Sequence, residues 1–199
     1  MKAGDIIKNA RTYLKDDKPN KYSFSDEFLL NILNQEHNFL LQEFNQGISL
    51  FTKKLTQKDF ILPMSSLKIL NAFLNGKKLD LQSFNYALET HKNSTGIKLV
   101  SLNMQNFSIE PYSEGILEIY YIPAMPIQNL EETLILEDIF FTLLTLRVIL
   151  QALKLETNER NLEKVRFYSQ ENQKETQRVI NLLNQSIAKN TTQTPYKIV

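Results

Sequence analysis

The sequence of 199 residues predicts an α+β protein that is mostly helical, with a four-helix body and a β-hairpin-rich insertion in its middle. Apolar residues recur at helical spacing near both ends of the chain. Extended apolar runs and an Asn-Gly pair occupy the middle, where they predict strands and a hairpin. We therefore expect four segments: an N-terminal helical pair at 1–50, a β-rich insertion at 60–126, a C-terminal helical pair at 130–189 and an extended tail at 190–199.

The first helical pair is expected between residues 3 and 47. Apolar side chains from Ala3 to Leu14 follow helical spacing, and Pro19 with its polar neighbours ends this element. Ser25 can cap a second helix, with carboxylates in its first turn, and Gly47 is its natural stop. The short connection predicts that the two helices pack as an antiparallel pair.

The insertion contains the strongest local signal in the sequence. Asn75 and Gly76 lie between two extended runs, and a type I′ turn needs positive φ at both positions. Lys77 and Lys78 follow the turn and would project at a basic hairpin tip, unless they only make that tip soluble. Further strands are predicted at 97–102, 107–110 and 115–122.

The second helical pair begins after Leu130. Its first helix is apolar on most of its circumference, which predicts burial within the subunit, between subunits, or both; Phe140 and Phe141 lie in this stretch. Arg147 lies in the same apolar surroundings and needs either a carboxylate or carbonyl partner or a route to the surface. The last helix has a polar middle, 169–178, which must be solvated or packed against something polar.

Composition excludes most kinds of reactive site. The chain has no cysteine and only two histidines, His37 and His91, whose neighbours do not have the spacing of metal ligands. No glycine-rich phosphate-binding motif occurs, and the carboxylates at Glu131, Glu132, Glu137 and Asp138 fit an ordinary first helical turn. We therefore expect no cofactor, no metal and no catalytic residue, and a protein that is not an enzyme.

Charge and hydropathy limit the partners. The net charge of +1 argues against binding to nucleic acid by bulk charge. Lys53, Lys54 and Lys58, with phenylalanines nearby, could contact a nucleic-acid backbone or simply occupy a solvated loop. Charged residues interrupt the apolar stretch 134–155, so a buried helix is a better interpretation than a membrane span. The charged amino terminus does not resemble a secretory signal, and we expect the chain to start in the cytoplasm.

Several stretches together carry a family resemblance. They are AGDIIKNARTYLKDD, SFSDEFLLNILNQEHNFLLQEF, a Phe-Ile-Leu-Pro element, LEIYYIPAMP, LEDIFFTLLTLRVILQALKLE and NERNLEKVRFYSQENQ. Their order and character resemble the head-to-tail adaptor proteins of tailed bacteriophages, also called connector or head-completion proteins. The length and the β insertion are also similar to the tail tubular A proteins of short-tailed phages.

The resemblance implies a homo-oligomeric ring, commonly dodecameric, between the portal protein and the tail or nozzle protein. It implies a place in the neck of the virion, assembly in the host cytoplasm, and an axial channel through which double-stranded DNA passes without specific binding. Phe140, Phe141 and Arg147 would then lie at the subunit interface, and the tip Asn75, Gly76, Lys77 and Lys78 would face the channel or the tail. The tail residues Pro195, Tyr196, Ile198 and Val199 would bind the portal.

Two other classes of protein fit the same residues. A cytoplasmic helical protein–protein adaptor would show the same helices without forming a ring. A weak nucleic-acid-binding module would use the lysine clusters and would show salt-dependent affinity for DNA.

Overall fold

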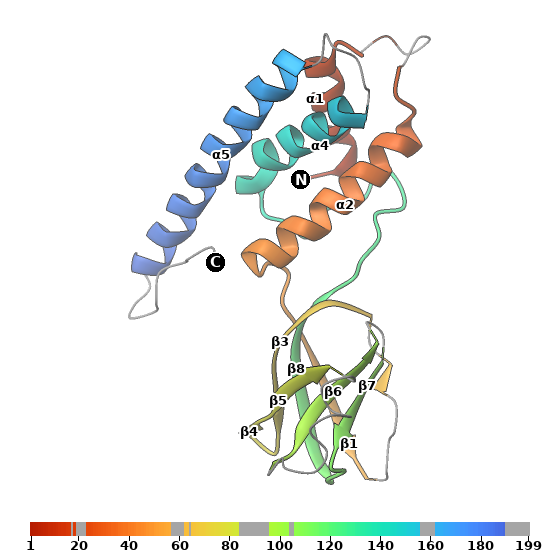
Figure 1. Ribbon diagram of the computed structural model, residues 1–199, viewed down its shortest axis with the longest axis vertical. Helices are drawn as coiled ribbons and strands as arrows, with labels where there is room; N and C mark the ends of the chain where they lie inside the picture. The colour runs from red at the N-terminus through yellow and green to blue at the C-terminus, as the bar shows by residue number, and fades with distance from the viewer. Residues whose placement is uncertain are drawn as a thin grey trace. The chain divides into compact units, whose positions relative to one another are not determined.

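A computed structural model describes residues 1–16, 18, 23–56, 62, 63, 65–83, 96–103, 106–155 and 162–189. The chain is an α+β protein that divides into two compact units (Figure 1). Unit 1 consists of Met1–Glu43 and Pro126–Val199 and carries the helices. Unit 2 consists of Phe44–Met125 and carries the strands. The second unit is thus inserted into the sequence of the first.

Unit 1 is built around helix α4 (Phe141–Leu155), which packs against α1 (Ala3–Leu14) and α5 (Leu162–Lys189). Most side chains of α4 are buried, as its apolar circumference predicts. The remaining long helix is α2 (Asp26–Phe44), where the backbone N–H of Phe28 donates to Ser25 Oγ at 3.1 Å. Ser25 therefore caps this helix as expected. The closest helical neighbour of α1 among the described residues is α4, not α2 as predicted.

The apolar helix of the second pair begins later than predicted. A single 3₁₀ turn, η2 (Asp138–Phe140), leads into α4, and residues 130–134 are not helical. Their backbone instead pairs with the start of the chain: Ala3 N donates to Glu132 O at 2.9 Å and Gly4 N to Leu130 O at 2.7 Å. Glu131 forms an ion pair with Lys2. Glu131 and Glu132 therefore do not lie in a first helical turn, because the backbone carbonyls of this segment accept hydrogen bonds from the amino-terminal residues.

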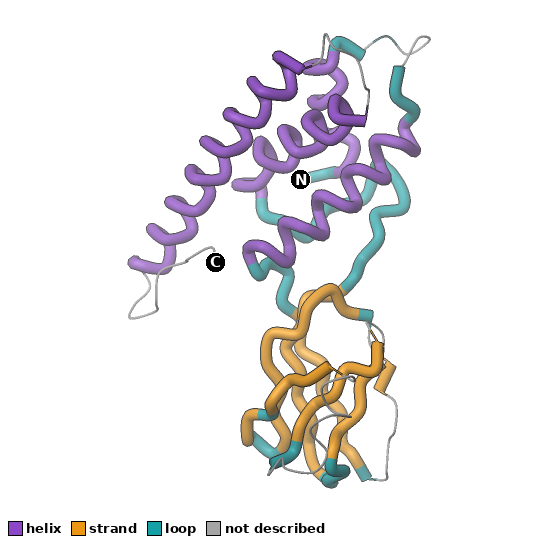
Figure 2. The backbone as a smooth tube through the Cα atoms, in the orientation of Figure 1, coloured by secondary structure: helices purple, strands orange, loops and turns teal. Residues whose placement is uncertain are grey.

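Unit 2 contains two small sheets (Figure 2). Their strand orders are β1-β8-β3-β4 and β2-β7-β6-β5, and β5–β6 is the parallel pair. The first sheet consists of β1 (Ser49–Leu55), β8 (Gly115–Pro123), β3 (Ser66–Leu74) and β4 (Lys77–Lys78). The second consists of β2 (Leu62–Pro63), β7 (Asn106–Glu110), β6 (Lys98–Asn103) and β5 (Asp80–Ser83).

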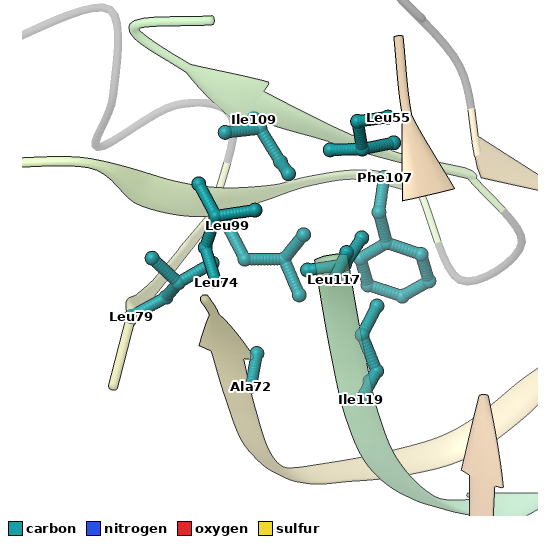
Figure 3. Packing of buried hydrophobic residues seen from close by; sticks show 9 residues of the cluster. All are labelled: Leu55, Ala72, Leu74, Leu79, Leu99, Phe107, Ile109, Leu117 and Ile119. Carbon is teal, nitrogen blue, oxygen red and sulfur yellow. The ribbon is translucent and has the colours of Figure 1, made fainter. Parts of the chain in front are cut away.

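Apolar side chains from both sheets form the core of unit 2 (Figure 3). Leu79 marks the point where the chain leaves the first sheet for the second, so the single run predicted after the Asn-Gly turn is two short strands. The core consists of Leu55, Ala72, Leu74, Leu79, Leu99, Phe107, Ile109, Leu117 and Ile119.

Strand β1 is not predicted by the sequence. Residues 49–55 pair with β8 over the whole length of β1, although Lys53 and Lys54 suggested a solvated loop. The side chains of β1 alternate between partly covered and exposed positions, and only Leu55 is fully buried. The backbone hydrogen bonds to β8 and the buried side chain of Leu55 therefore stabilise this strand, although its apolar alternation is weak.

Candidate interaction surfaces

The predicted hairpin tip, Asn75 to Lys78, is formed and rigidly held. Asn75 and Gly76 have φ of +50° and +75°, and Leu74 pairs with Lys77 across a two-residue turn, which confirms the prediction of a hairpin. The Asn75 side chain accepts a hydrogen bond from Ile116 N at 2.9 Å, and Asn75 N donates to Ile116 O at 2.9 Å. The tip is thereby fixed to the beginning of β8.

The fold brings both lysine clusters to the same end of the first sheet. Lys54 pairs with Ile116, next to the hairpin, while Lys77 and Lys78 lie on the other edge strand. Lys54, Lys77 and Lys78 are exposed and form no ion pair with any residue that the structure describes. Lys53, which precedes Lys54 in β1, interacts with another residue. Lys58 lies outside the described residues.

The first sheet also exposes apolar side chains on the face that points away from the core, here called the outer sheet face. Leu50 and Ile116 are each 51 % exposed, and Tyr120 pairs directly with Leu50 across the strands. Phe73 packs edge-on against Tyr120, with ring centroids 6.0 Å apart. An antiparallel sheet with one solvated face is normally polar on that face, so these residues indicate a contact surface.

Unit 1 has a groove of about 390 Å³ between α1, α4 and α5, here called the helical groove. Tyr13 and Phe167 are more than half exposed at this groove. Burial raises the pKa of Tyr168, and the nearby Tyr13 hydroxyl raises it further. The lining residues are Asn9, Tyr13, Thr142, Thr145, Leu146, Phe167, Tyr168, Glu171, Lys174, Glu175 and Arg178.

The polar middle of α5 supplies the charged residues of this groove. Lys174 pairs with Glu171 at 2.7 Å, and Arg178 with Glu175 at 2.6 Å. Because these ion pairs lie within one helix, the four charges neutralise each other in pairs, and Arg178 also donates to the Ile139 carbonyl at 3.3 Å. Phe167 has the helical spacing of a core residue in the sequence but is 56 % exposed, whereas Val179 is the fully buried side chain among those described on α5.

Arg147 has carboxylate partners inside unit 1. Its guanidinium donates to Glu43 Oε2 at 2.6 Å and lies 3.8 Å from a carboxylate oxygen of Glu36, both on α2. Gln151 donates to the other oxygen of Glu36 at 2.9 Å. Of the two explanations that the sequence left open for this arginine, a carboxylate partner is the one present.

The other predicted interface residues differ in their exposure. Phe140 is fully buried within the chain, so it has no surface to offer a neighbouring subunit, whereas Phe141 is half-buried. The predicted portal-binding residues, Pro195, Tyr196, Ile198 and Val199, lie outside the described residues, and so does His91.

Sequence reasoning missed Arg11, which is buried more deeply than Arg147. Arg11 on α1 pairs with Asp16 and with Asp26, at 2.7 Å for the latter, and donates to the Phe24 carbonyl at 2.9 Å. Asp16 in turn accepts a hydrogen bond from Ser23 N. An arginine on the apolar side of a helix, followed by two carboxylates after the helix ends, was the available signal.

Two negative findings apply to the part of the chain that the structure describes. No cluster of three or more histidine, aspartate or glutamate side chains is placed to hold a metal ion there. No described helix combines the length and the hydropathy of a membrane span.

Comparisons with protein families and with curated proteins identify no relative of this chain. No protein-family model matches this sequence, and no curated protein matches it significantly.

Proposed function

We propose that this chain is a structural virion protein whose copies form an adaptor ring between the portal and the tail or nozzle of a tailed bacteriophage. The ring is dodecameric, as the resemblance implies, lies in the virion neck and surrounds an axial channel for double-stranded DNA. The four helices form a mostly helical body that makes the ring, and unit 2 is an insertion carried by that body. The protein has no catalytic role.

The observation that carries this proposal is that each unit exposes its own apolar surface outside its own core. Unit 1 exposes Tyr13 and Phe167 at the helical groove, and unit 2 exposes Leu50, Ile116 and Tyr120 on the outer sheet face. Contiguous exposed apolar side chains mark interaction sites. A protein that joins two different partners needs two such surfaces.

Helix α5 supports ring formation in particular. It runs over 28 residues, yet Val179 is its one fully buried side chain among those described, and Leu162, Phe167 and Leu182 are exposed. Helical stability in proteins comes mainly from packing of an apolar face. Within its own subunit α5 buries only part of its apolar side chains, so it obtains only part of this stabilisation there. A neighbouring copy in a ring would cover these side chains.

The test combines the full chain with the portal protein encoded in the same genome. We expect mass photometry and negative-stain electron microscopy to show a ring with portal present, and a Leu162→Ser/Phe167→Ser variant to stay folded by circular dichroism but lose the ring. Gln170→Ser/Gln173→Ser, on the same helix, is the matched control. Binding as a single subunit to one protein partner would instead favour a helical protein–protein adaptor and contradict the proposal.

The same assay tests the tail. Deleting 194–199 removes the residues proposed to bind the portal, Pro195, Tyr196, Ile198 and Val199, and an extended peptide of this kind suits a sheet edge or groove. We expect unchanged helicity and loss of portal attachment. A truncated chain that binds the portal with wild-type affinity would show that the tail is not the anchor.

A further inference from the structure

We propose that the hairpin end of unit 2 binds the phosphate backbone of double-stranded DNA without sequence preference, through Lys54 and Lys78. The site lies within unit 2 and does not depend on a ring, so it can be tested separately from the adaptor function. It goes beyond that function by assigning the residues that touch DNA.

The strand register places the lysines together although they are far apart in the sequence. Lys54 lies opposite Ile116, and Glu118, two residues along β8, lies opposite Phe73, which in turn lies opposite Lys78. Directly paired residues of antiparallel strands point to the same face of a sheet, so Lys54 and Lys78 both project from the outer sheet face. Lys77, the neighbour of Lys78 at the exposed tip, lies opposite the core residue Leu74 and therefore points to the other face, so the site consists of Lys54 and Lys78.

The spacing of these lysines suits duplex DNA. Lys54 is on the edge strand β1 and Lys78 on the edge strand β4, with β8 and β3 between them. Three strand spacings of about 4.8 Å separate the two backbones by about 14 Å. The major groove of B-form DNA is about 12 Å wide, so two flexible lysine side chains at this separation can reach the phosphates on both of its sides.

The tip is also pre-organised. Asn75 is bonded to Ile116 through its backbone and its side chain, so the backbone that carries Lys78 is held in place before any ligand arrives. A fixed site loses less conformational entropy on binding than a mobile one. Lysine is depleted from the centres of protein–protein interfaces, which favours a polyanion over a protein partner at this tip.

Nearby carboxylates keep the contact weak. Glu118 lies between the two edge strands on the same face, and Glu114 and Asp80 are exposed next to the hairpin. They offset part of the lysine charge, so the expected contact is easily released by salt. A weak contact that involves only phosphates suits a surface along which DNA must slide.

The experiment measures binding of the full chain to a fluorescent 30-base-pair duplex by anisotropy, at about 50 to 200 mM NaCl. Two phosphate contacts predict a slope of about −1.8 in the logarithm of the association constant against that of salt, which is about a 12-fold loss over this range. Lys54→Gln/Lys78→Gln should abolish this binding, and Lys78→Gln alone should reduce the slope by about 0.9. The matched control, Lys8→Gln/Lys154→Gln, removes the same charge from exposed positions of unit 1 and should bind like wild type.

Three results would overturn the inference. These are no binding by the wild-type chain at about 50 mM salt, an equal slope in the double variant and in wild type, or stronger binding to poly-L-glutamate of matched charge than to DNA. The last result would assign the site to an acidic protein surface. None of them bears on ring formation with the portal, so failure of this site and failure of the adaptor function remain distinguishable.

Discussion

Arg147 shows how much a single buried charge depends on its partners. Glu36 is buried beneath this arginine, and its carboxylate would keep only the Gln151 hydrogen bond if the guanidinium were removed. Breaking a buried ion pair is strongly destabilising because it leaves an uncompensated charge. We expect Arg147→Met to lower the free energy of unfolding by about 3 kcal/mol, as measured by urea unfolding followed by circular dichroism.

The controls for this variant separate charge from packing. Lys154→Met, at an exposed position of the same helix, should change the unfolding free energy by less than about 0.5 kcal/mol. Adding Glu36→Gln to Arg147→Met should restore much of the lost stability, since the buried charge is then gone. If the double variant is as unstable as the single one, the arginine contributes through its packing.

His37 makes the stability of the chain depend on pH. The residue is 1 % exposed, and neither ring nitrogen has a hydrogen-bond partner among the described residues. Burial lowers its pKa from 6.5 to about 4, so the unfolded chain binds a proton at a higher pH than the folded chain does. Stability is therefore complete above pH 6.5 and is lost as the pH falls towards 4. At pH 5 this loss should be about 2 kcal/mol.

The measurement compares wild type with His37→Leu by urea unfolding at a neutral pH and at about pH 5. The carboxylates are the same in both proteins. The difference between the two pH dependences of the unfolding free energy therefore isolates the contribution of His37. Equal pH dependences would show that protonation of His37 does not limit stability.

The sequence predicted the need for a partner at Arg147 but could not identify it. Glu36 and Glu43 are more than 100 positions away in the chain, and only the packing of α2 beside α4 brings them to Arg147. The burial of His37 could not be predicted for a related reason. Its sequence neighbours Glu36 and Asn38 are polar, which is typical of a surface or interface position, whereas the core side of α2 includes the histidine.

The turn between β3 and β4 depends on a glycine outside the turn. A Cβ atom at Gly115, which has φ of +150°, would overlap the side-chain amide of Asn75. Gly115→Ala should therefore break the hydrogen bonds that Asn75 makes to Ile116 and Glu114, in addition to straining its own backbone. Gly96 is the matched control, because its φ is +135° but, apart from its chain neighbours, no atom of the described residues lies within 4 Å of an added Cβ.

We expect Gly115→Ala to destabilise unit 2 by about 2 kcal/mol more than Gly96→Ala does, since net hydrogen bonds contribute about 1 kcal/mol each. Hydrogen exchange of the Ile116 amide should become faster in the first variant and stay unchanged in the second. If both variants behave alike, backbone strain and not the loss of the Asn75 contacts accounts for the effect.

Strands and helices differed in how well the sequence predicted them. The Asn-Gly hairpin was predicted correctly, because a two-residue turn with positive φ has a strong local signal. Strand β1 was missed, because Lys53 and Lys54 interrupt its apolar alternation and its pairing with β8 is non-local. The start of α4 was placed too early, because the backbone of 130–134 is satisfied by residues at the other end of the sequence.

For the whole molecule, the sequence predicted a helical protein with a β insertion, and the α+β class is confirmed. The insertion was placed at 60–126, whereas unit 2 begins at Phe44 because β1 precedes the predicted region. The exposed surfaces were harder to predict. An apolar residue in a helix or strand pattern indicates burial but cannot show whether its own chain or another molecule covers it. Phe167 and Leu50 are examples.

The division into two units makes a final prediction about folding. Every residue of the core in Figure 3 belongs to Phe44–Met125, so the hydrophobic stabilisation of unit 2 does not require the helices. Burying one large apolar side chain contributes about 1.5 to 3 kcal/mol, and domains of more than about 50 residues commonly fold alone. We expect the fragment Phe44–Met125 to fold, with a strand-rich circular dichroism spectrum and a cooperative thermal transition. The matched control is the same fragment with Leu117→Asp, which places a carboxylate at a fully buried position and should be unfolded. If the unmodified fragment resembles this control, the β unit depends on the helical unit for its stability, and the two interaction surfaces cannot act as separate modules.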